Sequence, residues 1–144
     1  FLFFGTVAEN NMVANNADVI FHAAGGTGLG VIDAAKEAGI WAIGVDSDQS
    51  KVAPKTILTS AMKRVDNAVY DEAKAVLEGN YKAGAKTYTL EDGGVDIAPT
   101  TDNLSKELLE EVEGVKAKIV SGEVKVPNNK ADFEAKYGDI YELD

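Results

Sequence analysis

A glycine-rich turn at residues 25–30 could bring the backbone of this chain close to a ligand. It reads Gly-Gly-Thr-Gly-Leu-Gly and lies between an apolar, β-branched segment, residues 18–24, and a segment with helical spacing, residues 29–38. Glycine permits close approach of a backbone, and the first N–H groups of a helix lack partners within the helix. The turn is therefore either a ligand-binding loop, to which Gly25 and Gly26 would contribute backbone, or a structural tight turn.

The spacing of these glycines does not match the two common phosphate-binding fingerprints. The third position of a dinucleotide-binding Gly-x-Gly-x-x-Gly/Ala pattern falls on Val31 or on Asp33, depending on the register. A P-loop needs Lys-Ser/Thr after its last glycine, but Val31 and Ile32 follow instead. A nucleotide-dependent enzyme with a Rossmann-like core is thus disfavoured, and we expect neither a cofactor nor catalysis.

Two carboxylates follow the next apolar segment, residues 41–45. Asp46 lies twenty residues after Gly26, as does the ribose-binding acid of dinucleotide folds. A carboxylate at a strand end can accept both hydrogen bonds of a vicinal diol. Asp46 and Asp48 could also perform acid–base chemistry. We expect the two carboxylates to point to opposite sides of the loop after the strand, however, and no nucleophile stands beside a base.

Two cations, Lys63 and Arg64, follow another short apolar segment, residues 57–60. They are either solvated charges at the start of a helix or partners of a nearby acid or ligand. Two positive charges beside a helix N-terminus are unfavourable, and this conflict is a reason to expect a function for them. Pairing with Asp46 or Asp48, or donation to a ligand, would resolve it.

These residues require alternating strands and helices to position them. We expect strands at residues 1–6, 18–24, 41–45, 57–60, 86–90 and 95–98, an extended segment at 123–126, and helices at 29–38, 62–78 and 106–121, with short helices at 7–16 and 131–137. Gly39, Gly79 and Gly122 stand where helices end, and Ser105 where one begins. This order predicts an α/β fold with a mostly parallel sheet, in which ligands bind outside the carboxyl ends of the strands.

Composition limits the remaining function classes. The chain has 144 residues, a net charge of −10 and no cysteine, so it can form one domain without disulfides or thiolate metal sites. Its acidity argues against a general nucleic-acid surface. His22 is the only histidine, which argues against a histidine-based metal site; inside a predicted strand, it is expected to be buried and structural.

Five segments carry a family resemblance: DVIFHAAGGTGLG from residue 18, AIGVDSDQ from residue 42, LTSAMKRVDNAVY from residue 58, EDGGVDIAP from residue 91 and IVSGEVKVP from residue 119. Together they resemble the basic membrane protein family, the PnrA-like nucleoside-binding lipoproteins of bacterial ABC transporters. The resemblance implies the C-terminal lobe of a type I periplasmic-binding fold, in which two α/β lobes with flavodoxin- or Rossmann-like layers hold a ligand between them. Residues 17–127 would form this lobe, residues 1–16 its atypical start and residues 128–144 an acidic tail.

The resemblance also implies a function and a set of ligand contacts. The full-length protein would bind a purine nucleoside and deliver it to a permease, outside the cytoplasm and anchored as a lipoprotein whose anchor is not in this chain. Asp46 would bind the ribose hydroxyls, Lys63 would donate to the ligand, and Gly25 and Gly26 would line the cleft, with Asp48 and Arg64 behind them. The N-terminal lobe would supply the base contacts. An effector-binding domain of a transcription regulator and a self-associating isolated lobe are the alternatives.

Overall fold

The computed structural model describes residues 10–140, which lie in two compact units, Phe1–Leu108 and Leu109–Asp144. The strand expected at residues 1–6 lies outside the described residues. Residues 10–14 are helical, in agreement with the described part of the short helix expected at 7–16.

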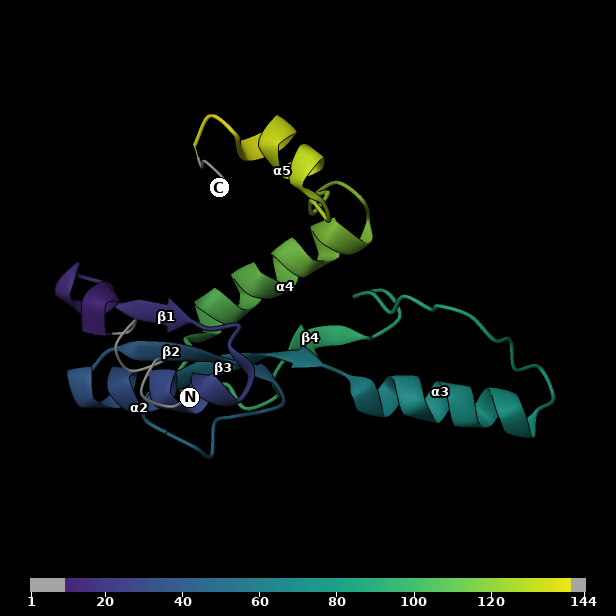
Figure 1. Cartoon of the computed structure of the whole chain (residues 1–144), viewed down its shortest axis with the longest axis horizontal. Helices are drawn as coiled ribbons and strands as arrows, with labels where there is room; N and C mark the ends of the chain where they lie inside the picture. Colours follow the sequence, from purple (N-terminus) through teal and green to yellow (C-terminus); the bar gives the residue numbers. More distant parts are fainter. Residues whose placement is uncertain (1–9, 141–144) are drawn as a thin grey trace. The chain divides into compact units, whose positions relative to one another are not determined.

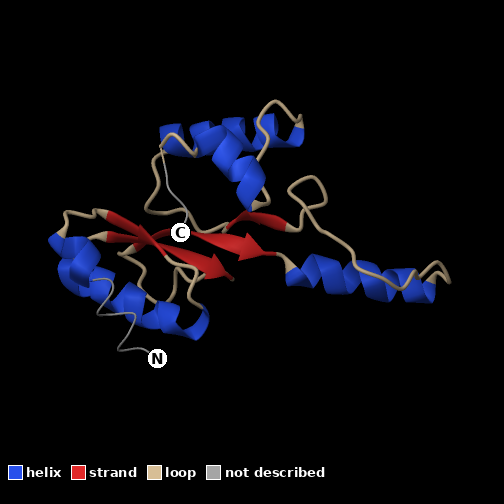
Figure 2. Ribbon diagram, turned by 45° about the horizontal axis from the view of Figure 1, so that its top comes forward, coloured by secondary structure: helices blue, strands red, loops and turns tan. Residues whose placement is uncertain are grey.

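The first unit contains a sheet of four strands in the order β1-β2-β3-β4 (Figures 1 and 2). The strands are β1 (Val19–Phe21), β2 (Trp41–Asp46), β3 (Ile57–Lys63) and β4 (Val95–Ile97). The first three are parallel, and β4 runs antiparallel to β3. The α/β class and the mostly parallel sheet are therefore confirmed.

Helix α2 (Gly28–Ala38) covers one face of this sheet and provides most of the core. Ile32 and Ala35 pack with Ala42 and Ile57 of β2 and β3, and all four are buried. Full burial of a side chain such as Ile32 contributes about 1.5–3 kcal/mol. Gly39 closes the helix in the left-handed conformation, as its position predicts.

The opposite face of the sheet is more open. Along β1, Ile20 is buried whereas Val19 and Phe21 are exposed, and on β2 Trp41 is exposed next to buried Ala42. This alternation follows from the two-residue repeat of a strand. The apolar residues on this face need a cover that the described residues do not supply in full.

Helix α3 (Val65–Leu77) begins later than expected because β3 is longer than expected. Met62 is placed in β3 by its pairing with Asp46, and Lys63 by its pairing with Val95. The expectation of a helix from residue 62 was thus wrong at its start. Propensity does not distinguish the two states here, and the ladder to the neighbouring strands decides between them.

The prediction of a strand at residues 86–90 was also wrong, since this segment has no regular structure. Its backbone does not join the sheet; instead Thr89 N–H donates to the Asp92 carboxylate at 3.2 Å. Alternation of polar and apolar residues indicates a strand only where a neighbouring strand can pair with it.

Two helices follow β4. Helix α4 (Lys106–Val120) begins in the first unit, where the Ser105 hydroxyl accepts from Leu108 N–H at 3.1 Å, as expected of an N-cap, and continues in the second. The short helix expected at residues 131–137 is confirmed and is α5 (Lys130–Tyr137). The three- and four-residue spacing of apolar residues on α4 predicts a buried stripe, formed by Leu108, Val112, Val115 and Ile119. This prediction is wrong, since no residue of the helix is buried. Periodicity identifies an apolar face but not what covers it. The extended segment expected at residues 123–126 is not a strand.

Candidate functional site

The carboxyl ends of β1, β2 and β3 meet at one edge of the sheet because these strands are parallel and adjacent. A short 3-10 turn, η1 (Gly25–Thr27), follows β1 and leads into α2. Asp46 ends β2 and Lys63 ends β3. The topology thus places the glycine turn, a carboxylate and an ammonium group at the edge where open α/β sheets bind ligands.

Asp46 and Lys63 form an ion pair, with 2.7 Å between Lys63 Nζ and Asp46 Oδ1. Their side chains are 52% and 72% exposed, respectively. Pairs this exposed contribute only about 0.2–1 kcal/mol to stability. The pairing expected for Lys63 is present, and both groups retain lone pairs or protons with which to bind a ligand.

Asp46 has a backbone conformation that residues other than glycine rarely adopt, with φ of 68°. Ser47 N–H donates to the Val45 carbonyl at 2.8 Å, which closes a γ-turn centred on Asp46. A γ-turn with positive φ is rare and strained, and such strain costs on the order of 1–3 kcal/mol. Strain of this kind persists where the surroundings hold it, and it clusters at ligand sites.

Gln49 and Ser60 stabilise this turn through hydrogen bonds. The Gln49 side-chain oxygen accepts from Val45 N–H at 2.9 Å, and Gln49 N–H donates to Ser60 Oγ at 3.1 Å. Ser60 is fully buried in β3. A Cβ at Gly44 would overlap Ser60 Oγ and the Gln49 side chain, so glycine is needed there. This support was not expected from the sequence, because residues eleven positions apart meet only across the sheet.

Asp48 points to other partners than Asp46. Its carboxylate accepts from the Thr100 hydroxyl at 2.6 Å and from Ser50 N–H at 3.0 Å. The Thr100 hydrogen bond is the main reason that the pKa of Asp48 lies below its usual value, and the Ser50 hydrogen bonds add to the effect. Asp48 therefore ties the end of β2 to the segment after β4, whereas Asp46 pairs with Lys63.

Arg64 does not join the Asp46–Lys63 pair. Its guanidinium donates to the Asp66 carboxylate from Nε at 3.0 Å and from Nη2 at 2.7 Å. These hydrogen bonds raise the pKa of Arg64 and lower that of Asp66. Asp66 lies in the first turn of α3, where a negative charge offsets the two cations that precede the helix.

The glycine turn has open space on one side and a buried histidine on the other. Gly25 has φ of 52°, and a Cβ at Gly25 or Gly26 would meet no atom within 4 Å. A Cβ at Gly28 would instead overlap the imidazole ring of His22. His22 is buried, as expected, but it follows β1 and supports the start of α2. Its position three residues before Gly25 was the available sequence signal for this contact with the turn.

Metal-holding side-chain clusters and membrane-spanning helices are both absent from the described residues. Within residues 10–140, no group of three or more His, Cys, Asp or Glu side chains is arranged to hold a metal ion. None of the described helices is both long and apolar enough to cross a membrane.

A model of the Bmp family, described as "ABC transporter substrate-binding protein PnrA-like", matches residues 5–130. The chain belongs to this family. Among relatives in the family, the CD4+ T-cell-stimulating antigen of Listeria monocytogenes is 41% identical over 140 residues, covering 85% of this chain and 39% of that protein. Basic membrane protein D of Borreliella burgdorferi is 38% identical over 136 residues, covering 90% of this chain and 40% of that protein.

Two solved structures resemble the Bmp-family chain closely. A solute-binding protein of an ABC transporter system from Aeropyrum pernix K1 has a TM-score of 0.74 and 27% identity, covering 91% of this chain and 46% of its own. A transcriptional activator of the comK gene from Bacillus halodurans has a TM-score of 0.72 and 28% identity, covering 77% and 39%. The chain spans about two fifths of the length of the curated relatives it matches.

Proposed function

We propose that this chain supplies the ribose-binding half of a purine nucleoside site in the solute-binding component of a bacterial ABC transporter. The exposed Asp46–Lys63 pair, held at the ligand-binding edge of a parallel sheet, is the observation that carries the proposal. Family membership supports the transporter role.

Each group of the site has a separate task in this proposal. The Asp46 carboxylate accepts hydrogen bonds from the two ribose hydroxyls, and charge-assisted bonds of this kind are roughly twice as strong as neutral ones. Lys63 donates from its ammonium group to a sugar or base oxygen while remaining beside Asp46. Gly25 and Gly26, which have open space around them, allow the ligand to approach the backbone. Asp48 and Arg64 support the site indirectly, by stabilising the loops that carry the ligand contacts.

The proposed role is binding without chemistry. The second half of the site, with the contacts that read the base, comes from the part of the full-length protein outside this chain. The full-length protein acts outside the cytoplasm as a membrane-anchored lipoprotein and delivers the nucleoside to a permease. A half-site cannot enclose a ligand, so tight binding belongs to the full-length protein.

Isothermal titration calorimetry of the full-length gene product with inosine and guanosine tests the proposal. Asp46→Asn removes the charged acceptor and is expected to weaken binding by about tenfold to a hundredfold, since hydrogen bonds to charged groups contribute about 1.5–3 kcal/mol. Asp71→Asn, the same change at an exposed position of α3, serves as the control and is expected to leave affinity unchanged. Equal affinity of Asp46→Asn and the unsubstituted protein would refute the ribose contact.

An effector-binding domain of a transcription regulator is the second candidate. The likeness to the transcriptional activator from Bacillus halodurans favours it specifically. The same site would then hold a regulatory ligand instead of a transported one. A DNA-binding segment encoded upstream of this chain would support this function, whereas a signal peptide with a lipid-anchoring cysteine would support transport.

Self-association of the isolated chain is the remaining alternative. The exposed apolar residues on the open sheet face, Val19, Phe21 and Trp41, would favour it. Size-exclusion chromatography with light scattering measures the mass directly, and a monomer across the accessible concentration range would exclude this alternative.

A further inference from the structure

The last residues of β2 extend beyond the strand beside them. β1 ends at Phe21, which lies opposite Ile43, so residues 44–46 have β3 on one side and no strand of the described residues on the other. Backbone N–H and carbonyl groups that are shielded from water need hydrogen-bond partners, and side chains can provide them where a strand does not. The end of β2, which carries Asp46, is such a place.

The Gln49 side chain provides a partner at Val45, the residue directly before Asp46. Gln49 Oε1 accepts from Val45 N–H at 2.9 Å, and the Val45 carbonyl accepts from Ser47 N–H at 2.8 Å. Both backbone polar groups of Val45 therefore have partners within residues 45–49. These two hydrogen bonds fix the backbone on the N-terminal side of Asp46 and close the γ-turn around it.

Gln49 also connects this turn to the strand that carries Lys63. Gln49 N–H donates to Ser60 Oγ at 3.1 Å, and Ser60 lies fully buried in β3, three residues before Lys63. A Cβ at Gly44 would lie 2.5 Å from Ser60 Oγ and 2.7 Å from Gln49 Oε1, so both side chains pack directly over that glycine. The half-buried Gln49 thus bridges the ends of β2 and β3.

The ion pair between Asp46 and Lys63 does not by itself explain the conformation of Asp46. Both side chains are more than half exposed, and an exposed pair stabilises by less than the strain of a γ-turn with positive φ costs. Such strain persists only where the surroundings determine the conformation. The hydrogen bonds of Gln49, one of them to a fully buried hydroxyl, supply these surroundings.

We propose that Gln49 is a positioning residue of the binding site. The proposal rests on the proposed function: the Gln49 side chain holds the strained turn so that the Asp46 carboxylate already stands beside Lys63 when the ligand diol arrives. Preorganisation of this kind raises affinity, because the acceptor is ordered on folding and does not have to be ordered on binding. Gln49 acts through Asp46 and need not touch the ligand.

Calorimetry with inosine and guanosine on the full-length gene product tests the proposal. Gln49→Met keeps the length of the side chain but removes the oxygen that accepts from Val45 N–H. We expect it to weaken binding by about threefold to tenfold, which corresponds to the loss of one intramolecular hydrogen bond. Ser60→Ala removes the acceptor of Gln49 N–H and is expected to weaken binding to a similar extent. Unchanged affinity of either variant would overturn the proposal.

Thr59→Val is the matched control for Ser60→Ala. It removes a neighbouring hydroxyl of β3 that is also buried but has no hydrogen-bond partner among the described residues. We expect this variant to keep the affinity of the unsubstituted protein. A loss equal to that of Ser60→Ala would overturn the proposal, because any change in the interior of β3 would then have the same effect.

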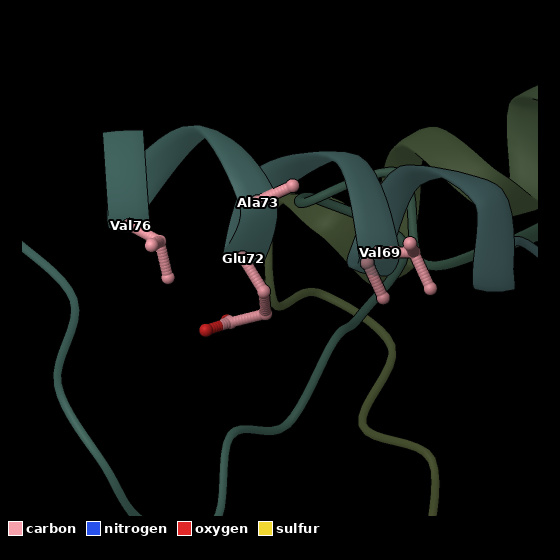
Figure 3. A pocket seen from close by; sticks show the side chains of 5 residues that line it. Val69, Glu72, Ala73 and Val76 are labelled. Atoms are coloured by element: carbon pink, nitrogen blue, oxygen red, sulfur yellow. The ribbon is translucent and has the colours of Figure 1, made fainter. Parts of the chain in front are cut away.

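Glu72→Met is the matched control for Gln49→Met. Glu72 lies about two turns into α3, where its carboxylate accepts from Tyr88 Oη at 3.0 Å, and Figure 3 shows it beside Val69 and Val76. This variant also loses one side-chain acceptor, but not one that is bonded next to Asp46. It is expected to leave affinity unchanged, and a loss equal to that of Gln49→Met would contradict a specific role of Gln49.

A double-mutant cycle shows whether Gln49 acts through Asp46. In the Asp46→Asn background the charged contact is already lost, so Gln49→Met is expected to weaken binding by less than it does in the unsubstituted protein. A merely structural role would produce the same fold-loss in both backgrounds. That result would overturn the proposal.

A measurement without ligand separates this proposal from the function on which it rests. Asp46→Gly and Asp46→Ala both remove the ion pair with Lys63, but only glycine adopts positive φ without strain. Urea denaturation of this chain, followed by Trp41 fluorescence, should give Asp46→Gly the higher midpoint of the two, and this difference should shrink when Gln49→Met is added. A difference of the same size with and without Gln49→Met would overturn the positioning role. Failure of the unsubstituted full-length protein to bind either nucleoside would instead refute the proposed function.

Discussion

Substitution of Gly28 by alanine tests how the glycine turn is held above β1. An added methyl group at this position would overlap the ring of His22, which is only 4% exposed and lies against the start of α2. Overpacking of a well-packed site costs about 1–3 kcal/mol. Alanine would otherwise gain up to about 1 kcal/mol over glycine in a helix. The overlap is the larger effect, and we expect Gly28→Ala to destabilise the first unit by about 1 kcal/mol.

Urea denaturation followed by tryptophan fluorescence measures this effect in the unit that contains it. Trp41 is the only tryptophan of the chain and pairs with Val19 in the sheet. Gly26→Ala is the control, because a Cβ there meets nothing within 4 Å, and it is expected to change the midpoint little.

The pair His22→Ala and Gly28→Ala separates an overlap from a general loss of packing. Removal of the ring creates space for the methyl group, so the double variant is expected to be more stable than the sum of the two single effects predicts, by about 1 kcal/mol. Strict additivity, or a Gly28→Ala variant more stable than the unsubstituted chain, would refute the argument.

Two further predictions concern other parts of the chain. Thr100→Val removes the main hydrogen bond that lowers the pKa of Asp48, and the pKa is expected to rise toward 3.8. A carboxyl group whose pKa is lower in the folded state than in the unfolded state stabilises the fold at pH values above the unfolded pKa. This stabilisation is lost as the pH falls through the folded-state pKa. The variant has less of it to lose, so its stability should fall less below about pH 4. NMR titration of the Asp48 carboxyl measures this, and an unchanged pKa would contradict it. Gly114→Ala, in α4 where a Cβ meets nothing within 4 Å, is expected to raise the thermal midpoint through about 0.8–1 kcal/mol of helix propensity, and an unchanged or lower midpoint would contradict it.

The family and most of the sheet could be predicted from the sequence because their signals are local. The apolar segments at β1, β2 and β3, the helical spacing of α2 and its closing Gly39 depend on residues close together in the chain. The order of strands and helices then predicts that Asp46 and Lys63 emerge at one edge, and the structure pairs them.

The tertiary structure alone decided features that depend on residues far apart in the sequence. The extension of β3 to Lys63 results from its pairing with Val95, and the loss of the strand expected at residues 86–90 from the lack of a partner for it. The γ-turn at Asp46 and its support by Ser60 exist only once β2 and β3 are adjacent. No residue of α3 or α4 is buried, because the helical repeat of apolar residues carries no information about which surface will cover them.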